Sequence, residues 1–105
     1  MNRAIRIEPE AAVELEEASR WYDMKRPGLG MEFLEAFDGL LSHIARWPRA
    51  GARVAEVAED LPVRRVPVGR FPYHVVYLET PTAIRILAVA HDRREPKYWH
   101  ARTPK

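Results

Sequence analysis

Residues Val63–His91 read VRRVPVGRFPYHVVYLETPTAIRILAVAH, and this stretch decides the fold. Three runs rich in β-branched and aromatic residues, Val63–Val68, Tyr73–Glu79 and Ala83–His91, are separated by turns that contain proline or glycine. Short runs bounded in this way are typical of strands joined as hairpins. The last run is apolar on most of both faces, which predicts a central strand. Pro67 lacks a ladder donor, so the first strand is expected near an edge or a bulge.

A strand and a helix are predicted before this stretch. Ala4–Glu8 alternates weakly between apolar and charged residues, and Pro9 can open a helix because its missing N–H costs nothing there. Lys25–Gly28 ends this helix. Its apolar stripe consists of Ala11, Leu15, Ala18 and Tyr22. The carboxylates of the same helix are interpreted as a solvated face, and they are Glu10, Glu14, Glu16 and Glu17.

A second amphipathic helix follows and stops at Pro48. Its apolar face is formed by Phe33, Phe37, Leu40, Ile44 and Trp47. The short turn between the helices predicts a helical hairpin, and the connector after Pro48 is expected to hold at most a short strand around Arg53–Val57. The fold class is therefore α+β: a small antiparallel β-sheet with an N-terminal helical hairpin packed on one face, in β-α-α-β-β-β order. One domain is expected to span residues 1–105.

Several classes of function are disfavoured by composition. The 105 residues include no cysteine, which excludes disulfides and thiolate chemistry. The four histidines are scattered without zinc-site spacing, and no glycine-rich phosphate loop follows a strand, so we expect no metal and no cofactor. The first residues lack the apolar core of a signal peptide, and no apolar run reaches the length of a membrane span. A cytoplasmic protein that does not contact a membrane is predicted.

The charge is divided unevenly along the chain. Residues 1–60 hold 8 Lys/Arg and 12 Asp/Glu, a balance of −4, whereas residues 61–105 hold 9 and 3, a balance of +6. The two halves sum to the net charge of +2. A basic C-terminal half suggests an anionic partner, either nucleic acid or an acidic peptide. A solvated basic face is an equally good interpretation from charge alone.

The basic half also carries histidine and aromatic residues, which gives it three chemical abilities. Arginine and lysine bind phosphates, Tyr98 and Trp99 can stack on bases, and His74 or His91 could move a proton near neutral pH. Cleavage of RNA through its 2′-OH needs these functions and no metal. Alternatively, Tyr98 and Trp99 cover the end of the core while the arginines form surface ion pairs. The chemistry alone favours this second interpretation.

Three ordered blocks resemble the RelE/ParE toxins of bacterial type II toxin–antitoxin systems. They read EAAVELEEASRWYDMKRPGLGMEFLEAFDGLLSHIARWP, RRVPVGRFPYHVVY and ILAVAHDRREPKYWHAR, and the match runs from about Ile5 to Arg102. The resemblance implies a small antiparallel sheet with an N-terminal helical hairpin. It also implies a growth-inhibiting toxin that is neutralised by a cognate antitoxin, whose extended or helical segment wraps it.

The resemblance leaves the target open between two subfamilies. RelE-like toxins cut mRNA on the ribosome, whereas ParE-like toxins inhibit DNA gyrase. Of the RelE pattern, Arg65 and Tyr98 match, but Pro67 replaces a basic residue, His74 replaces an arginine, and Asp92 stands where a later arginine is expected. A one-residue shift to the neighbouring Arg93 or Arg94 would restore the last position. The segments RFPYHVVY and AVAHDRREPKYW are more similar to ParE-like or plasmid-stabilisation proteins, so a toxin that acts by binding is the preferred hypothesis.

Three hypotheses therefore stand: a ParE-like toxin that binds gyrase, a ribosome-dependent mRNA endonuclease, and an inert member that binds only its antitoxin. If the chain is a ribonuclease, the expected catalytic set is Arg65, His74, His91, Arg93 and Tyr98. Residues expected to bind nucleic acid or another target are Arg64, Arg70, Arg94, Lys97, Trp99 and Arg102.

Overall fold

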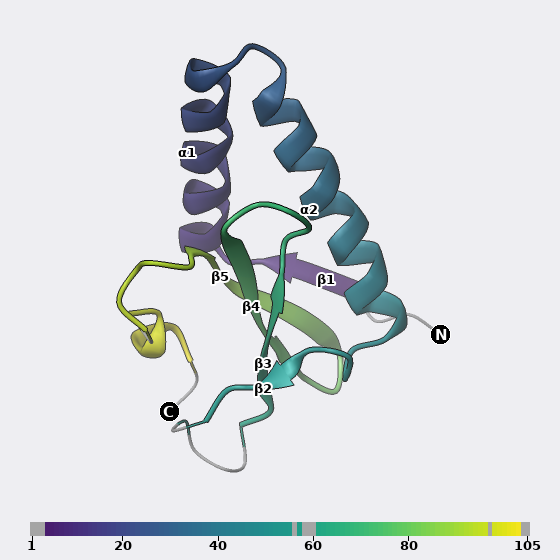
Figure 1. The fold of residues 1–105 in the computed structure, drawn as a ribbon. Coiled ribbons are helices and arrows are strands. Elements are labelled where there is room, and N and C mark those ends of the chain that lie inside the picture. Colours follow the sequence, from purple (N-terminus) through teal and green to yellow (C-terminus); the bar gives the residue numbers. More distant parts are fainter. Residues whose placement is uncertain (1–3, 56, 58–60, 97, 104–105) are drawn as a thin grey trace.

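The computed structural model describes residues 4–55, 57, 61–96 and 98–103, with two helices packed against a five-stranded sheet (Figure 1). The chain order is β1 (Ala4–Ile7), α1 (Pro9–Lys25), α2 (Leu29–Arg46), β2 (Ala52–Arg53), β3 (Val63–Pro67), β4 (Tyr73–Glu79), β5 (Ala83–His91) and the 3-10 turn η1 (His100–Arg102). The predicted α+β class and the helical hairpin are confirmed. The connector strand is shorter and begins earlier than the range predicted around Arg53–Val57.

The strand order in the sheet is β1-β5-β4-β3-β2, which places β5 in the interior as predicted. All pairs are antiparallel except β1 and β5, which run parallel with Ala4 opposite Ala83. The helical hairpin separates β1 from the other strands in sequence, so no tight turn forces an antiparallel partner on it. Pro67 pairs with His74 of β4 and lies beyond the part of β3 that β2 covers, so its missing donor breaks no ladder on that side.

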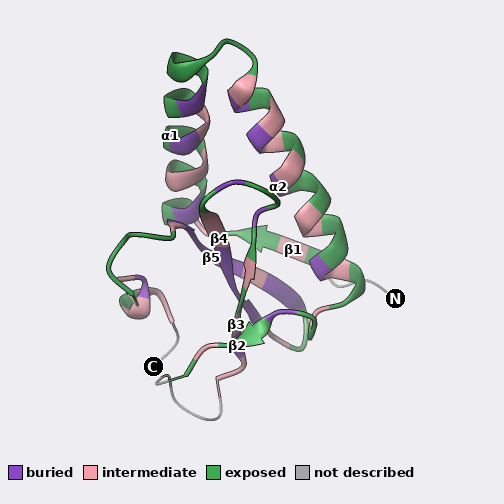
Figure 2. Ribbon diagram, viewed as in Figure 1, coloured by how far each residue is buried: buried purple, intermediate pink, exposed green. Residues whose placement is uncertain are grey.

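The larger core lies between the helical hairpin and one face of the sheet. Buried residues of this core include Phe33, Phe37 and Ile44 of α2 and Val75 and Tyr77 of β4. Figure 2 shows that the buried positions of both helices face inward and that the exposed positions face outward. The predicted stripe of α2 was one residue too long. Trp47 is 54% exposed, because α2 ends at Arg46 and the Trp47 backbone leaves helical geometry.

The hairpin turn depends on two glycines. Gly28 has a φ of +90°, a left-handed conformation that side chains disfavour. Gly30 lies where α2 crosses α1, and a Cβ at this position would stand 2.4 Å from the backbone oxygen of Ser19. The Gly30 N–H donates a 2.8 Å hydrogen bond to Oδ1 of Asp23, which fixes the first turn of α2 against the end of α1.

A smaller core covers the opposite face of the sheet. Trp99, which follows β5 in the chain, is 3% exposed and packs with Val63, Val76, Leu78, Leu87 and Ala88. Figure 1 shows the segment after β5 running beside the lower end of α1 before it returns toward the sheet. The C-terminal segment thus forms a third layer, and Trp99 covers part of the sheet face that the helices leave open.

Candidate functional site

A hollow of about 270 Å³ lies where the C-terminal segment meets β3, β4 and β5, and we call it the C-terminal hollow. The candidate residues that line it are Arg65, His74, His91, Arg94, Tyr98 and Trp99. The hairpin register explains this gathering, because Pro67 pairs with His74 and Tyr73 pairs with His91 at the same end of the sheet. The structure therefore brings together a cation, two imidazoles and a phenol that are distant in sequence.

His74 is paired with Asp92 at the rim of this hollow. Nδ1 of His74 lies 2.9 Å from Oδ1 of Asp92, and the side chains are 12% and 49% exposed. Asp92 is held in place because its N–H donates to the Pro72 carbonyl, 2.9 Å away. A carboxylate on Nδ1 fixes the imidazole ring and favours the tautomer that carries its proton there. Nε2 is then the atom through which His74 could exchange a proton.

His91 is held differently. Its Nδ1 accepts a 3.0 Å hydrogen bond from the N–H of Arg93, and its ring meets the Tyr73 ring edge-on at 5.0 Å. An accepting Nδ1 matches the tautomer of His91 that carries its proton on Nε2. The Arg93 side chain is exposed and does not line the C-terminal hollow. Of the expected catalytic set, the hollow thus collects all members except Arg93.

The hydroxyl of Tyr98 donates a hydrogen bond to Glu14 of α1. The distance from the Tyr98 oxygen to Oε2 of Glu14 is 2.6 Å. Burial, and secondarily this hydrogen bond, raise the pKa of Tyr98 well above the ordinary value of a phenol. The Arg94 guanidinium stacks over the ring, 3.7 Å from its centroid. Tyr98 is therefore a neutral hydrogen-bond donor that is clamped between a carboxylate and a cation.

Glu14 joins α1, β5 and the C-terminal segment. Its Oε1 accepts from the backbone N–H of Val89 at 3.0 Å and from Nη1 of Arg102 at 2.9 Å. Its Oε2 accepts from Tyr98, from Nη2 of Arg102 at 3.2 Å and from Arg94 at 3.4 Å. The side chain is only 10% exposed. Charge-assisted hydrogen bonds of this kind are roughly twice as strong as neutral ones, so Glu14 holds the segment firmly.

The interpretation of Glu14 as part of a solvated face is wrong, because its side chain is largely buried. Ala11 and Ala18 are buried on the inner stripe of α1, and Glu14 is three residues after the first and four before the second. Residues at these spacings lie on the same face of a helix, so the periodicity itself indicated an inward position. Its charge is tolerated there because two arginines and a phenol surround it.

The remaining candidates are scattered. Nη1 of Arg64 donates to the Gly51 carbonyl at 2.8 Å, so Arg64 fastens the connector to β3. Arg70 pairs with Glu32 of α2 and stacks on Phe71, on the helical side of the sheet. Arg102 is 17% exposed and also donates to the Leu87 carbonyl at 3.0 Å. Lys97 lies outside the described residues.

The buried position of Trp99 gives its ring a structural role in this conformation. The indole packs in the smaller core under the C-terminal segment, which is the alternative weighed for it from the sequence. Stacking on a base needs an open ring face, so Trp99 would have to leave the core to bind a target in this way. Arg65, by contrast, is exposed, and within the described ranges its side chain makes no ion pair or hydrogen bond.

Within the described residues, no group of three or more histidine, cysteine, aspartate or glutamate side chains could hold a metal ion. In the same part of the chain, neither helix is long and apolar enough to span a membrane.

Comparisons with known proteins agree with this architecture. A family model described as "ParE toxin of type II toxin-antitoxin system, parDE" matches residues 5–96. A chain in the solved structure "Chromosomal ParDE TA system from P. aeruginosa" aligns with a TM-score of 0.72 and 19% identity, over 85% of this chain and 95% of that one. At this identity the likeness shows the fold alone. No curated protein matches the chain. The family match includes Glu14 and ends before Tyr98 and Arg102.

Proposed function

The chain belongs to the ParE toxin family of type II toxin–antitoxin systems, and from this premise we propose that it arrests growth by binding a protein target, with DNA gyrase first among the candidates. We further propose that a cognate antitoxin neutralises it. Both partners would meet it in the cytoplasm. The proposal concerns the mode of action, which family membership leaves open between binding and mRNA cleavage.

The contact between Tyr98 and Glu14 is the main observation in favour of action by binding rather than by catalysis. Metal-independent RNA cleavage needs a group that gives or takes a proton at the reacting atoms. The Tyr98 hydroxyl is turned to Glu14 at 2.6 Å, and Arg102 and Arg94 are committed to the same carboxylate. Three candidates for target chemistry thus hold the chain's own C-terminal segment in place. Groups that bond to an internal carboxylate are less available to exchange a proton with a substrate, which supports recognition over proton transfer.

A supercoiling assay tests the gyrase target. The purified toxin is expected to inhibit supercoiling by gyrase in proportion to its concentration, and preincubation with the antitoxin is expected to restore activity. Gyrase that keeps its full activity at high excess of toxin contradicts this target. Induction in cells should then be followed with reporters of DNA damage and with transcript mapping in parallel, which separates the two modes of action.

The antitoxin is proposed to be the product of a short neighbouring gene, with a segment that folds on the toxin. Because residues 61–105 carry a positive net charge, we expect the antitoxin segment to be acidic or amphipathic. This segment would bind the open face of the sheet or the helical hairpin. Coexpression of the two genes is expected to abolish growth arrest and to yield a stable complex. A toxin that arrests growth equally with and without the neighbouring gene product contradicts this pairing.

A second candidate function, ribosome-dependent cleavage of mRNA, is favoured by the pair His74–Asp92. His74 lies in the C-terminal hollow with the exposed Arg65, so a proton carrier and a phosphate-binding cation share one cavity. Primer extension on translated mRNA would then reveal discrete cuts that disappear in His74→Ala and in a Tyr98→Phe/His91→Ala double variant. Intact transcripts in growth-arrested cells would exclude this function.

A further inference from the structure

A second hollow, of about 730 Å³, lies between α1 and the adjoining ends of β4 and β5, and we call it the α1 groove. Its lining includes Glu17, Trp21, Tyr22, Tyr73, His91 and Arg94. The function proposed above assigns no role to Glu17, Trp21 or Tyr22 in this groove. It opens beside the helical hairpin, where the chain carries most of its acidic residues.

Aromatic rings form a continuous wall along the groove. The ring centroids of Trp21 and Tyr22 are 5.1 Å apart, those of Tyr22 and Tyr73 are 6.1 Å apart, and those of Tyr73 and His91 are 5.0 Å apart. Trp21 is 52% exposed, so a ring face at one end is open to a partner. Nζ of Lys25 lies 4.8 Å from the Trp21 ring centroid, which shows that a cation is already attracted to this ring.

The groove is also lined by hydrogen-bond acceptors that have no partner among the described residues. Within the described part of the chain, Glu17 is in no ion pair, and the hydroxyls of Tyr22 and Tyr73 make no hydrogen bond. Burial raises the pKa of both tyrosines, and the negative charge of Glu17 raises that of Tyr73 further. The Glu17 carboxylate and the Tyr73 phenol both line the groove, and both can accept hydrogen bonds from a donor that enters it.

Arg94, the cation that lines the groove, is already paired with the carboxylate of Glu14. Arg94 stacks over Tyr98 at 3.7 Å and pairs with Glu14 at 3.4 Å, while Glu14 is also paired with Arg102. Glu17 remains as the lining charge that no ion pair within the described residues balances. A groove with an unpaired carboxylate and the exposed indole of Trp21 is complementary to a positively charged, donor-rich group.

We propose that the α1 groove receives a basic side chain of the antitoxin, with arginine preferred, which stacks on the aromatic wall and donates to Glu17. Arginine suits the groove better than lysine because its planar guanidinium can stack and can donate two parallel hydrogen bonds to one carboxylate. This inference rests on the proposed toxin–antitoxin pairing and adds the chemistry of one recognition point. The acidic surface of α1 thereby complements a partner whose other segments face the basic sheet.

A titration with short peptides tests the groove without the antitoxin. The probe is the blocked tripeptide Leu-Arg-Leu, and its control carries citrulline, which has the shape of arginine without the charge. We expect a saturable change in tryptophan fluorescence that is lost in Trp21→Phe and that needs at least about five times more citrulline peptide. Glu17→Gln should weaken arginine binding to the level of the control. Equal responses to the two peptides, or no saturable response to arginine at millimolar concentration, overturn the proposal.

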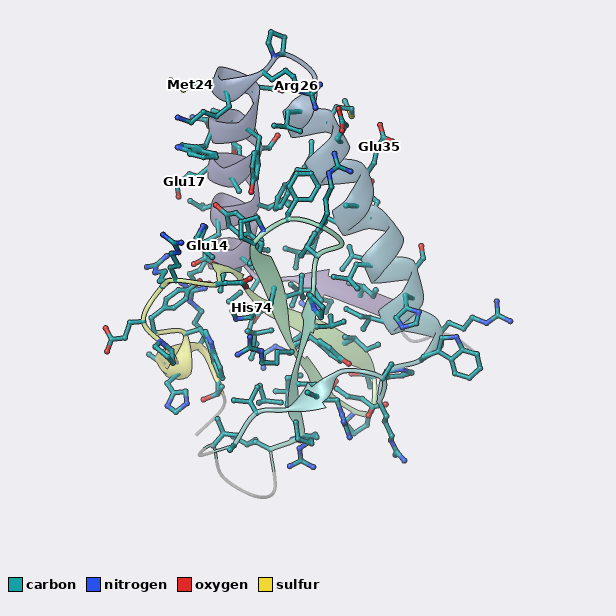
Figure 3. The ribbon with its side chains drawn as sticks, viewed as in Figure 1. Glu14, Glu17, Met24, Arg26, Glu35 and His74 are labelled. Carbon is teal, nitrogen blue, oxygen red and sulfur yellow. The ribbon has the colours of Figure 1, made fainter. Side chains whose placement is uncertain are left out.

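A second measurement uses the antitoxin itself. Glu17→Lys is expected to raise the dissociation constant of the complex on the order of 100-fold, because the introduced cation faces the incoming one. Glu35→Lys, which makes the same charge change at an exposed position of α2, should alter it by less than about two-fold. Figure 3 shows Glu17 on α1 and Glu35 on α2. Circular dichroism checks that both variants are folded.

The outcomes separate this inference from the proposed function. If Glu17→Lys binds the antitoxin as tightly as the wild type does, the groove is not a recognition point and the inference is wrong, although the toxin–antitoxin pairing stands. If the wild type fails to bind the neighbouring gene product, the pairing is wrong. In that case the antitoxin half of the inference fails with it, and the peptide titration decides whether the groove binds basic side chains at all.

Discussion

The hydroxyl of Tyr98 donates a 2.6 Å hydrogen bond to the carboxylate of Glu14, a residue 84 positions earlier in the chain. Figure 3 places Glu14 in the N-terminal part of α1, near the C-terminal segment. Through this contact and its ion pairs with Arg94 and Arg102, one carboxylate fastens the third layer of the fold to the first helix. The stability of that layer should therefore depend on Glu14 more than on any exposed glutamate of α1.

Glu14→Gln is expected to lower the free energy of unfolding by about 2–4 kcal/mol. The substitution removes the charge that balances two arginines, and Arg102 is only 17% exposed, so its guanidinium loses a partner that water replaces poorly. Urea denaturation measures the loss. The matched control is Glu35→Gln, at an exposed position of α2, which should change the free energy of unfolding by less than about 0.5 kcal/mol. Equal effects of the two variants would contradict the role of Glu14.

The raised pKa of Tyr98 predicts a loss of stability in alkaline solution. A group that is neutral when protonated and whose pKa is higher in the folded state stabilises the fold fully below its unfolded value, near 10.0. As the pH rises above that value, the unfolded phenol releases its proton before the folded one does, and the stabilisation declines. Tyr98→Phe should therefore show a shallower fall in unfolding free energy above pH of about 10 than the wild type shows. Parallel pH profiles for the two proteins would argue against this effect.

Most of the fold could be predicted from the sequence because its signals are local. The bounds of β4 and β5 follow from Tyr73–Glu79 and Ala83–His91 as predicted, and Pro9 marks the start of α1. The parallel pairing of β1 could not be predicted, because no residue of Ala4–Ile7 specifies the direction of a partner that lies on the far side of the helical hairpin.

The candidate site was less predictable, because it depends on contacts between distant residues. The sequence indicated a basic, aromatic C-terminal segment but not which of its residues turn inward. Trp99 and Tyr98 are adjacent, yet one fills a core and the other bonds to Glu14. Glu14 had a local signal in its spacing from Ala11 and Ala18. Its partners, however, come from β5 and from beyond it, and no local pattern identifies them.

The close approach of the helices at Gly30 predicts opposite effects for two glycines of α2. In Gly30→Ala the new Cβ meets the Ser19 backbone oxygen at 2.4 Å, so the helices must separate, at a cost of about 1–3 kcal/mol or more. Gly39→Ala meets no atom within 4 Å and should stabilise the protein by about 0.5–1 kcal/mol, because alanine has the higher helix propensity. Thermal denaturation distinguishes the two. A Gly30→Ala variant as stable as Gly39→Ala would contradict the packing described at the hairpin.

The buried hydroxyl of Tyr77 predicts a loss of stability when it is removed. It donates to the Pro48 carbonyl at 2.8 Å and accepts from the Gly51 N–H at 3.1 Å, and Tyr77 is fully buried. Tyr77→Phe keeps the ring but leaves two backbone groups without this partner, which should cost about 1–3 kcal/mol. Hydrogen exchange at the Gly51 amide should accelerate more than exchange at amides of α1. Unchanged exchange at Gly51 would show that water replaces the hydroxyl at no cost.

The neighbours Arg64 and Arg65 separate stability from target binding. Arg64→Gln loses the 2.8 Å bond to the Gly51 carbonyl and should cost about 1 kcal/mol, with the growth arrest reduced only in proportion to the folded protein. Arg65 lines the C-terminal hollow and makes no contact of this kind within the described ranges, so Arg65→Gln should leave the unfolding free energy within about 0.5 kcal/mol. If the hollow contacts the target, Arg65→Gln should nevertheless relieve growth arrest at equal expression. The unchanged stability of Arg65→Gln would exclude unfolding as the cause of any lost toxicity. Full toxicity of Arg65→Gln would show that the hollow does not contact the target.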